Sequence, residues 1–238
     1  MVVYHNMKNY LVIGGSSGIG LSIVNQLVNT GNNVYSTYFS NELNQLNQKA
    51  NYIKYNASTD EIDLTHVPDT LDGFIYCPGS ISLKPFKRIK SEDLIEDFRL
   101  NVVGAITSLQ KALPKLLNAE KSSIVLFSSV AVKTGFNFHS QVTTCKGAIE
   151  GLAISLAAEF APKIRVNTIS PSLTNTKLSK KLLSNEDKVN ANKERHPLKQ
   201  IGNPNEISEL ACFLLSDKSS WITGQNIITD GGISSLRV

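Results

Sequence analysis

Short apolar runs rich in β-branched residues alternate along the chain with longer segments in which apolar positions recur every three or four residues. The short runs are typical of buried strands, and the periodic segments are typical of helices packed on a core. Strands are predicted at residues 10–13, 33–39, 52–55, 73–77, 123–127, 164–169 and 226–229. Helices are predicted at residues 19–29, 42–49, 92–117, 143–160 and 206–215, and Gly31 is the expected C-cap of the first.

Most of the predicted strands are apolar throughout, and helical segments separate them. Strands that are apolar on both faces form a parallel sheet that helices cover on both sides. Right-handed crossovers then produce a doubly wound, Rossmann-like α/β arrangement. Because no repeat, low-complexity tract or linker interrupts the chain, we expect one α/β domain over residues 1–238 with a seven-stranded parallel sheet.

Two connections do not follow the regular pattern. Residues 56–72 include Pro68, so any helix in this connection must be short. Residues 175–204 are polar and rich in lysine, with few strong helix signals. Long segments of this kind at the carboxyl edge of a sheet are typical of mobile lids, and the alternative is a surface excursion without a role. We therefore expect residues 175–204 to form a substrate lid.

Composition and charge exclude several classes of protein. The net charge is +4, and no dense block of Lys and Arg marks a nucleic-acid-binding arm. The apolar runs are too short to span a bilayer, and residues 1–9 lack the apolar centre of a signal peptide. Cys77, Cys145 and Cys212 have no metal-ligand spacing, so we expect reduced thiols, no metal site and a cytoplasmic location.

A glycine-rich turn joins the first predicted strand to the first predicted helix. Gly14 permits a tight turn, Gly18 lets the backbone approach a pyrophosphate, and Gly20 lets the helix pack closely on the sheet. The helix N-terminus adds free N–H groups and a partial positive charge. The turn therefore predicts a bound nicotinamide dinucleotide. Its predicted binding residues are Gly14, Ser16, Ser17, Gly18, Ile19 and Gly20.

The Gly-x-x-x-Gly-Ile-Gly spacing of this turn resembles the short-chain dehydrogenase/reductase family. Further segments match that family in the same order along nearly the whole chain. These segments are Tyr76-Cys77-Pro78-Gly79, Asn101, Ser128-Ser129, Lys146, residues 165–171 and residues 197–232. The last segment is closest in pattern to the β-ketoacyl-acyl-carrier-protein reductase branch. The resemblance implies a Rossmann-like fold and an NAD(P)-dependent oxidoreductase.

The resemblance also implies where a cofactor would lie. The adenosine ribose is expected at Tyr38, Phe39 and Ser40, where the carboxylate that would select NAD is missing. The basic residue that usually accompanies NADP lies next along the chain or within the glycine turn in that family, and these positions hold Phe39 and Ser17 here. The absence of a repelling carboxylate favours NADP, with NAD still possible. The adenine is expected at Asn56 and Ala57. The remaining contacts are expected at Cys77, Pro78, Gly79, Lys146, Pro171, Ser172, Leu173, Thr174 and Thr176.

The family's proton donor is a tyrosine four residues before the lysine. In this chain Val142 stands four residues before Lys146. Ser129, Lys146 and Asn101 match the family's other catalytic positions. His139 lies seven residues before Lys146 and could donate or relay a proton. Three hypotheses follow: a reductase with His139 as substitute acid, a cofactor-binding sensor or partner subunit with little activity, and a reductase whose proton comes from water or substrate.

The substrate class follows only from the resemblance. It implies a carbonyl or enoyl group on a small molecule or an acyl thioester. The lid is basic, which would suit an anionic substrate or a carrier such as coenzyme A, although a solvated surface is the alternative. The family's two long helices imply a homotetramer or homodimer. On the second of them, small residues are expected to face outward at Gly147, Gly151, Ala157 and Ala158.

Overall fold

The computed structural model describes residues 7–41, 43 and 46–237, and its centre is a parallel sheet. The strands are β1 (Asn9–Ile13), β2 (Asn33–Tyr38), β3 (Asn51–Lys54), β4 (Gly73–Tyr76), β5 (Ser122–Phe127), β6 (Ile164–Pro171) and β7 (Asn226–Thr229). Their order in the sheet is β3-β2-β1-β4-β5-β6-β7, and every neighbouring pair is parallel. Since the winding direction reverses between β1 and β4, a crevice is expected beyond their carboxyl ends.

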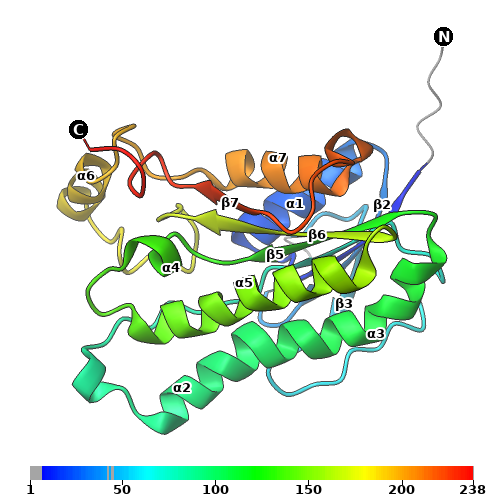
Figure 1. The fold of residues 1–238 in the computed structure, drawn as a ribbon, viewed down its shortest axis with the longest axis horizontal. Coiled ribbons are helices and arrows are strands. Elements are labelled where there is room, and N and C mark those ends of the chain that lie inside the picture. Colours follow the sequence, from blue (N-terminus) through cyan, green and yellow to red (C-terminus); the bar gives the residue numbers. More distant parts are fainter. Residues whose placement is uncertain (1–6, 42, 44–45, 238) are drawn as a thin grey trace.

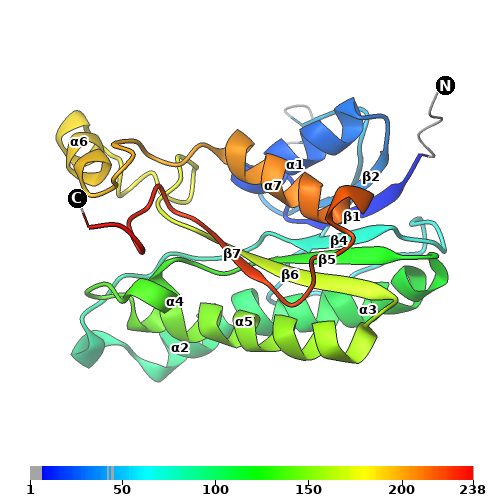
Figure 2. The same ribbon diagram turned by 45° about the horizontal axis from the view of Figure 1, so that its top comes forward.

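Helices cover both faces of this sheet, as Figures 1 and 2 show. The helices are α1 (Gly18–Asn29), α2 (Ser91–Phe98), α3 (Gly104–Asn118), α4 (Ala131–Thr134), α5 (Ser140–Phe160), α6 (Glu186–Glu194) and α7 (Pro204–Leu215). Helices α1 and α7 pack together on one face, while α3 and α5 cover the other (Figure 2). The predicted doubly wound α/β fold with seven parallel strands is confirmed.

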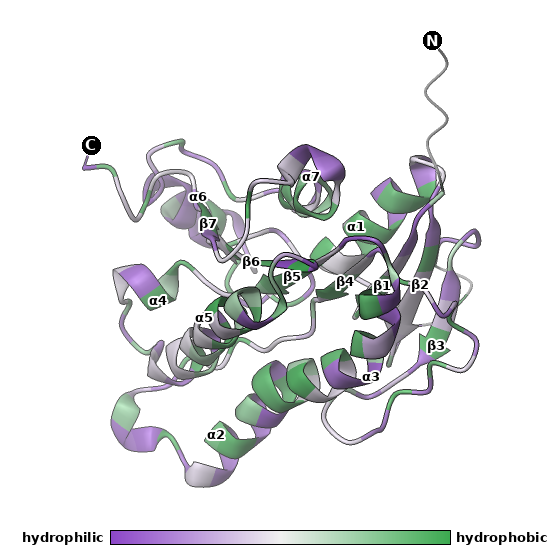
Figure 3. Ribbon diagram, turned by 45° about the vertical axis from the view of Figure 1, so that its right-hand side comes forward, coloured by the Kyte–Doolittle hydropathy of each residue, from purple (hydrophilic) through white to green (hydrophobic). Residues whose placement is uncertain are grey.

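The sheet separates two apolar cores, and β1 contributes to both. Leu11 and Ile13 point into the core under α3 and α5, whereas Tyr10 and Val12 point into the core under α1 and α7. This alternation follows from the two-residue period of a strand. Figure 3 shows β4 and β5 as apolar and α6, which lies outside the sheet, as mainly polar. No helix among the described residues is long and apolar enough to cross a membrane.

The helix predicted at residues 92–117 is interrupted by a π-helical turn over Arg99–Val103, which separates α2 from α3. Side chains bind two backbone carbonyl groups of this region. The Asn101 side-chain amide donates to the Asp97 carbonyl at 2.9 Å, and the Tyr76 hydroxyl donates to the Leu100 carbonyl. Side chains that bind backbone carbonyls in this way are typical of an interrupted helix, and the apolar periodicity does not reveal such contacts.

Three other predictions need correction. The helix predicted at residues 42–49 lies partly outside the described residues, and residues 46–49 form bends and turns. The Asn- and Gln-rich composition explains this, since such side chains bond to nearby backbone; the Gln48 amide donates to the Leu46 carbonyl at 3.0 Å. The polar lid contains a helix, α6. Its first turn is capped by Asn185, whose side chain accepts from the Lys188 N–H at 2.9 Å.

Ala157 was predicted to face outward on α5, but its side chain is 6% exposed and belongs to the core. Cys145, Ile149 and Ala153 precede it at four-residue intervals and are also buried. Ala157 therefore continues the inward stripe of the helix. By contrast, Gly151 and Ala158 are exposed and Gly147 is half-buried.

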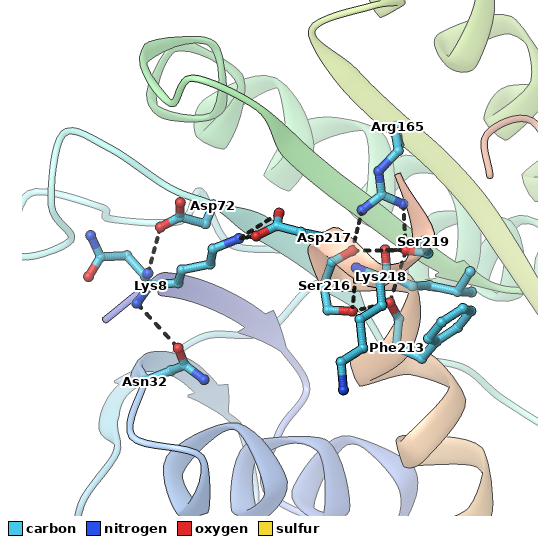
Figure 4. A network of polar contacts seen from close by, with 11 residues as sticks. Lys8, Asn32, Asp72, Arg165, Phe213, Ser216, Asp217, Lys218 and Ser219 are labelled. Atoms are coloured by element: carbon cyan, nitrogen blue, oxygen red, sulfur yellow. Dashed lines mark hydrogen bonds and ion pairs between the residues drawn. The ribbon is translucent and has the colours of Figure 1, made fainter. Parts of the chain in front are cut away.

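Polar contacts join separate parts of the chain at the amino edge of the sheet (Figure 4). The Lys8 ammonium lies 2.8 Å from the Asp217 carboxylate, and the backbone N–H of Asn9 donates to Asp72 at 2.8 Å. The Arg165 guanidinium donates to the Ser216 carbonyl at 3.0 Å and to the Ser219 hydroxyl at 2.9 Å. Together these contacts connect the first strand and β6 to the segment after α7.

Candidate functional site

A cavity of about 670 Å³ lies at the carboxyl ends of the strands, on the opposite edge from the network of Figure 4. Such a volume is in the range of small-molecule and cofactor sites. All residues predicted from the sequence to contact a cofactor line this one cavity. They are Gly14, Ser16, Ser17, Gly18, Ile19, Gly20, Tyr38, Phe39, Ser40, Asn56, Ala57, Cys77, Pro78, Gly79, Lys146, Pro171, Ser172, Leu173, Thr174 and Thr176.

The glycine turn has no room for side chains at its key positions. Gly14 has φ +78°, and a Cβ there would lie 2.9 Å from the Pro78 side chain. Gly18 has φ +53°, a left-handed conformation that favours glycine. A Cβ at Gly20 would clash with the Gly14 carbonyl oxygen, so the contact that requires glycine there lies within the turn itself. The turn therefore brings bare backbone to the cavity, as close approach of a ligand requires.

The turn is attached to β2, and the first N–H groups of α1 have no side-chain cap. The Gly14 N–H donates to the Thr37 hydroxyl at 2.8 Å, which fixes the turn against β2. Ser17 precedes α1 without a capping side-chain hydrogen bond, and the first turn of α1 holds no acidic residue. Free N–H groups at a helix N-terminus attract anions. The backbone here fits the pyrophosphate of a dinucleotide.

Lys146 lies buried in the wall of the cavity. A Cβ at Gly79 would lie 3.3 Å from the Lys146 ammonium and 3.2 Å from the Asn101 side-chain oxygen, so these two groups share the space beside Gly79. Burial lowers the pKa of Lys146 to about 8, because desolvation disfavours the charged form. The same burial raises the pKa of the neighbouring Cys77 thiol to about 12, which makes the thiol a poor nucleophile.

Asn101 does not line the cavity, unlike the other predicted catalytic residues. It is 3% exposed, and its amide donates to the Ser80 hydroxyl at 3.0 Å as well as to the Asp97 carbonyl. Its side-chain oxygen has no hydrogen-bond partner among the described residues. Asn101 is therefore positioned beneath the cavity wall at the π-helical turn, where it supports Ser80.

Ser129, Val142 and His139 also line the cavity. The Ser129 hydroxyl accepts from the Ala131 N–H at 3.2 Å at the start of α4. Val142 is 9% exposed and presents only apolar atoms. His139 Nδ1 lies 2.8 Å from the Asn137 carbonyl oxygen, and its ring centroid lies 5.3 Å from that of Phe136. Because a carbonyl can only accept, Nδ1 carries the proton, and Nε2 is left available.

His196 is a further lining residue that the sequence analysis did not single out. It is 4% exposed, and its Nε2 lies 2.8 Å from the Ser172 hydroxyl. Its Nδ1 lies 2.7 Å from the Asn192 carbonyl oxygen, so Nδ1 carries a proton, and the Ser172 hydroxyl is the donor to Nε2 in the tautomer that this contact favours. A lone histidine in a polar segment carries no periodic signal, which is why it was missed.

Residues 175–204, the predicted lid, contribute one wall of the cavity. The Arg195 guanidinium lies 5.3 Å from the centroid of the Phe136 ring, on the loop between α4 and α5. This cation–π contact joins the lid to the opposite wall. The charged side chains among the described lining residues are Lys146, Lys177 and Arg195, with no aspartate or glutamate. The cavity is thus suited to an anionic ligand.

The described residues offer no set of ligands for a metal ion. Within residues 7–41, 43 and 46–237, no group of three or more His, Cys, Asp or Glu side chains is arranged to hold a metal ion. The three cysteines, Cys77, Cys145 and Cys212, are free thiols.

The parallel sheet and the glycine-turn cavity define a Rossmann-like α/β protein, and comparisons identify its family. The enoyl-(acyl carrier protein) reductase family matches residues 14–234. The 3-oxoacyl-acyl-carrier-protein reductase FabG of Aquifex aeolicus is 30% identical over 242 residues, which cover 95% of this chain and 97% of FabG. A tropinone reductase homologue of Arabidopsis thaliana is 32% identical over 240 residues, covering 94% of this chain and 78% of the homologue.

A solved structure agrees with these sequences. Ligand-free aldohexose dehydrogenase of Thermoplasma acidophilum has a TM-score of 0.89 and 25% identity, covering 98% of this chain and 96% of that enzyme. The chain belongs to the short-chain dehydrogenase/reductase family of oxidoreductases.

Proposed function

We propose that this protein is an NADP-dependent reductase of a carbonyl or enoyl group whose active site lacks the usual tyrosine. The observation that carries this proposal is that one cavity is lined by the glycine turn and by Ser129 and Lys146 together. When bound, the reduced cofactor supplies a hydride. The relatives are reductases of a 3-oxoacyl thioester and homologues of tropinone reductase, which supports a carbonyl substrate.

The chain's own residues have distinct roles in this proposal. The turn from Gly14 to Gly20 binds the pyrophosphate through backbone N–H groups and the N-terminus of α1. Lys146, with a pKa of about 8, is mainly charged at neutral pH and donates hydrogen bonds to the nicotinamide ribose. Ser129 orients the substrate oxygen by a hydrogen bond, and both residues act largely by positioning.

Val142 has no proton to give, so another group must protonate the substrate. His139 and the Ser172–His196 pair both line the cavity. His139 has Nε2 available, whereas Nε2 of His196 already accepts from Ser172. A histidine within reach of the substrate can act as a general acid. We propose that the His139 imidazolium, with Nδ1–H bonded to the Asn137 carbonyl, gives its Nε2 proton to the substrate oxygen and then regains a proton from water. Water supplies the proton directly when the substrate leaves room for it.

The lid and the exposed helices bear on substrate and assembly. Arg195 and the basic lid favour a substrate with an anionic group or carrier, such as an acyl thioester of the ketoacyl reductase branch.

On the outer helices, Ile95 and Ile154 are 50% and 61% exposed, which supports a homodimer or homotetramer. We also propose that the chain forms one domain with a lid at residues 175–204, and that it works in the cytoplasm, where its thiols remain reduced.

The test is NADPH consumption over ketoacyl, enoyl and quinone substrates by the wild type, His139→Ala, His196→Gln and Val142→Tyr. We expect measurable wild-type turnover and a loss of about 100-fold in kcat for His139→Ala, the scale of general acid catalysis. If His196→Gln alone loses activity, the proton follows the Ser172–His196 pair instead. If only Val142→Tyr turns over, the natural protein binds its cofactor without efficient chemistry, as a sensor or partner subunit, and the reductase proposal is wrong.

A further inference from the structure

The two positions at which the resemblance places a cation for NADP hold Ser17 and Phe39, yet the structure brings a cation there from elsewhere. The Lys177 ammonium lies 3.3 Å from the Asn41 side-chain oxygen. The two residues are separated by 136 positions in the chain, and both line the cavity. Lys177 therefore reaches from the lid across to the loop that follows β2.

Asn41 is itself tied to the glycine turn. Its side-chain amide donates to the Ser16 carbonyl at 2.8 Å and to the Ser16 hydroxyl at 3.0 Å. Lys177, Asn41 and the glycine turn thus form one cluster beside Phe39 and Ser40, which line the same part of the cavity. Three segments that are distant in sequence converge where the adenosine ribose is expected.

The contact that the Lys177 ammonium makes with Asn41 is a neutral one, and it leaves the positive charge without a counter-ion among the described residues. No salt bridge joins Lys177 to an acidic residue among the residues that the structure describes, and no carboxylate is among the described lining residues of the cavity. A second, shallower cavity is lined by Gly18, Lys177 and Lys180 among others, so Lys177 lies on the wall between the two. An ammonium without a carboxylate partner, beside the expected ribose site and the Ser40 hydroxyl, fits a phosphate on that ribose.

We propose that Lys177, positioned by Asn41, binds the 2′-phosphate of NADP and is the residue that selects NADP over NAD. This inference rests on the proposed function, since it needs a cofactor in the cavity. Lys177 provides the point charge, Asn41 holds the ammonium in place, and the Ser40 hydroxyl provides a neutral hydrogen bond. The lid thereby contributes to cofactor selection as well as to enclosure of the substrate.

The alternative position for the ammonium is the pyrophosphate over Gly18, which NAD and NADP share. The two cases differ in their effect on the two cofactors. A lysine on the pyrophosphate weakens both equally, whereas a lysine on the 2′-phosphate weakens NADP alone. A pair of smaller probes, 2′,5′-ADP and 5′-ADP, isolates the same difference without the nicotinamide.

The experiment is calorimetric titration of NADP, NAD, 2′,5′-ADP and 5′-ADP into the wild type, Lys177→Met and Lys180→Met. Methionine keeps the length of the side chain and removes its charge. Loss of a charge-assisted hydrogen bond predicts an increase of about tenfold in Kd for NADP and 2′,5′-ADP in Lys177→Met, with Kd for NAD and 5′-ADP changed less than about twofold. Lys180→Met is the matched control, because Lys180 is an exposed lid lysine outside the main cavity, and its affinities should equal those of the wild type.

A rescue separates charge from lid structure. Adding Phe39→Arg to Lys177→Met puts a cation at the position where the resemblance expects one, and NADP affinity should recover. Equal weakening of NADP and NAD, or no weakening, would overturn the role of Lys177 while leaving the reductase proposal intact. If the wild type binds none of the four probes, the proposed function itself fails and this inference fails with it.

Discussion

The two edges of the sheet differ in whether their charged side chains have partners within the protein. At the amino edge, Lys8 lies 2.8 Å from the carboxylate of Asp217, and Arg165 donates to Ser216 and Ser219 (Figure 4). At the carboxyl edge, the described lining residues of the cavity include cations but no carboxylate. Polar groups at the first edge are satisfied within the chain, and those at the second are left available for a ligand.

The same physical effect, desolvation, has different consequences at these edges. Burial lowers the pKa of both Arg165 and Lys146. For Arg165, the charge of Asp217 opposes the decrease, and the guanidinium keeps protein acceptors. For Lys146, the cavity offers little compensation, and the pKa falls to about 8. A charge that destabilises the fold is retained where a ligand can use it, which is typical of functional sites.

The largest expected effect comes from Lys146→Met. Burial lowers the folded-state pKa of Lys146 from 10.5 to about 8, so at pH 7 the charged form is present at a cost to stability. Removing it should raise the free energy of unfolding by about 3 kcal/mol at pH 7, the equivalent of the shift. NADP affinity should fall about tenfold with the lost ribose contact. Urea unfolding and calorimetric titration measure the two effects.

The pH dependence of the free energy of unfolding tests whether the charge of Lys146 destabilises the fold. Between pH 8 and about 10.5 the unfolded chain binds more protons at this lysine than the folded chain, so wild-type stability rises with pH through that window. The advantage of Lys146→Met should therefore be full below pH 8 and disappear above about pH 10.5. Lys133→Met, at an exposed lysine on α4, is the control and should show no such profile. A Lys146→Met variant less stable than the wild type at pH 7 would contradict the comparison of the two edges.

A smaller effect of opposite sign is expected for Arg165→Met. The substitution removes donors to the Ser216 carbonyl and the Ser219 hydroxyl and leaves these groups partly unpaired. We expect the free energy of unfolding to fall by about 2 kcal/mol, the scale of a charge-assisted hydrogen bond, without a change in NADP affinity. Chemical denaturation and titration test both statements. Weakened NADP binding would show that the amino edge also shapes the cavity.

Local patterns were sufficient to predict much of the fold and a set of residues that the structure brings to one cavity. Fully apolar runs such as Ile124–Leu126 identify buried strands, and the glycine turn identifies itself through spacing within seven residues. The predicted cofactor residues all line one cavity because the loops after parallel strands meet at one edge. Element boundaries differ by a few residues at most for the strands.

The rest depended on contacts between distant segments, which no periodicity reveals. The Ser172–His196 pair is 24 residues apart, and its hydrogen bond arises from the path of the lid. The Lys177–Asn41 contact joins the segment after β6 to the loop after β2. The Tyr76 hydroxyl on β4 donates to the Leu100 carbonyl at the π-helical turn, within a helix that the sequence predicted to be continuous. Tertiary contacts of this kind decide how the site is completed.

The smallest expected effect separates charge pairing from hydrogen bonding at the amino edge. Asp217 is 84% exposed at its side chain, so Asp217→Asn should lower the free energy of unfolding by about 0.5 kcal/mol or less, because solvent screens a surface ion pair. The effect should vanish in 1 M salt, where the screening length is about 3 Å. Glu194→Gln, which breaks the exposed Lys199–Glu194 pair of the lid, is the matched control at the other edge and should behave alike. If Asp217→Asn costs as much as Arg165→Met, the amino edge is held by its ion pair, and the neutral acceptors around Arg165 matter less than the geometry indicates.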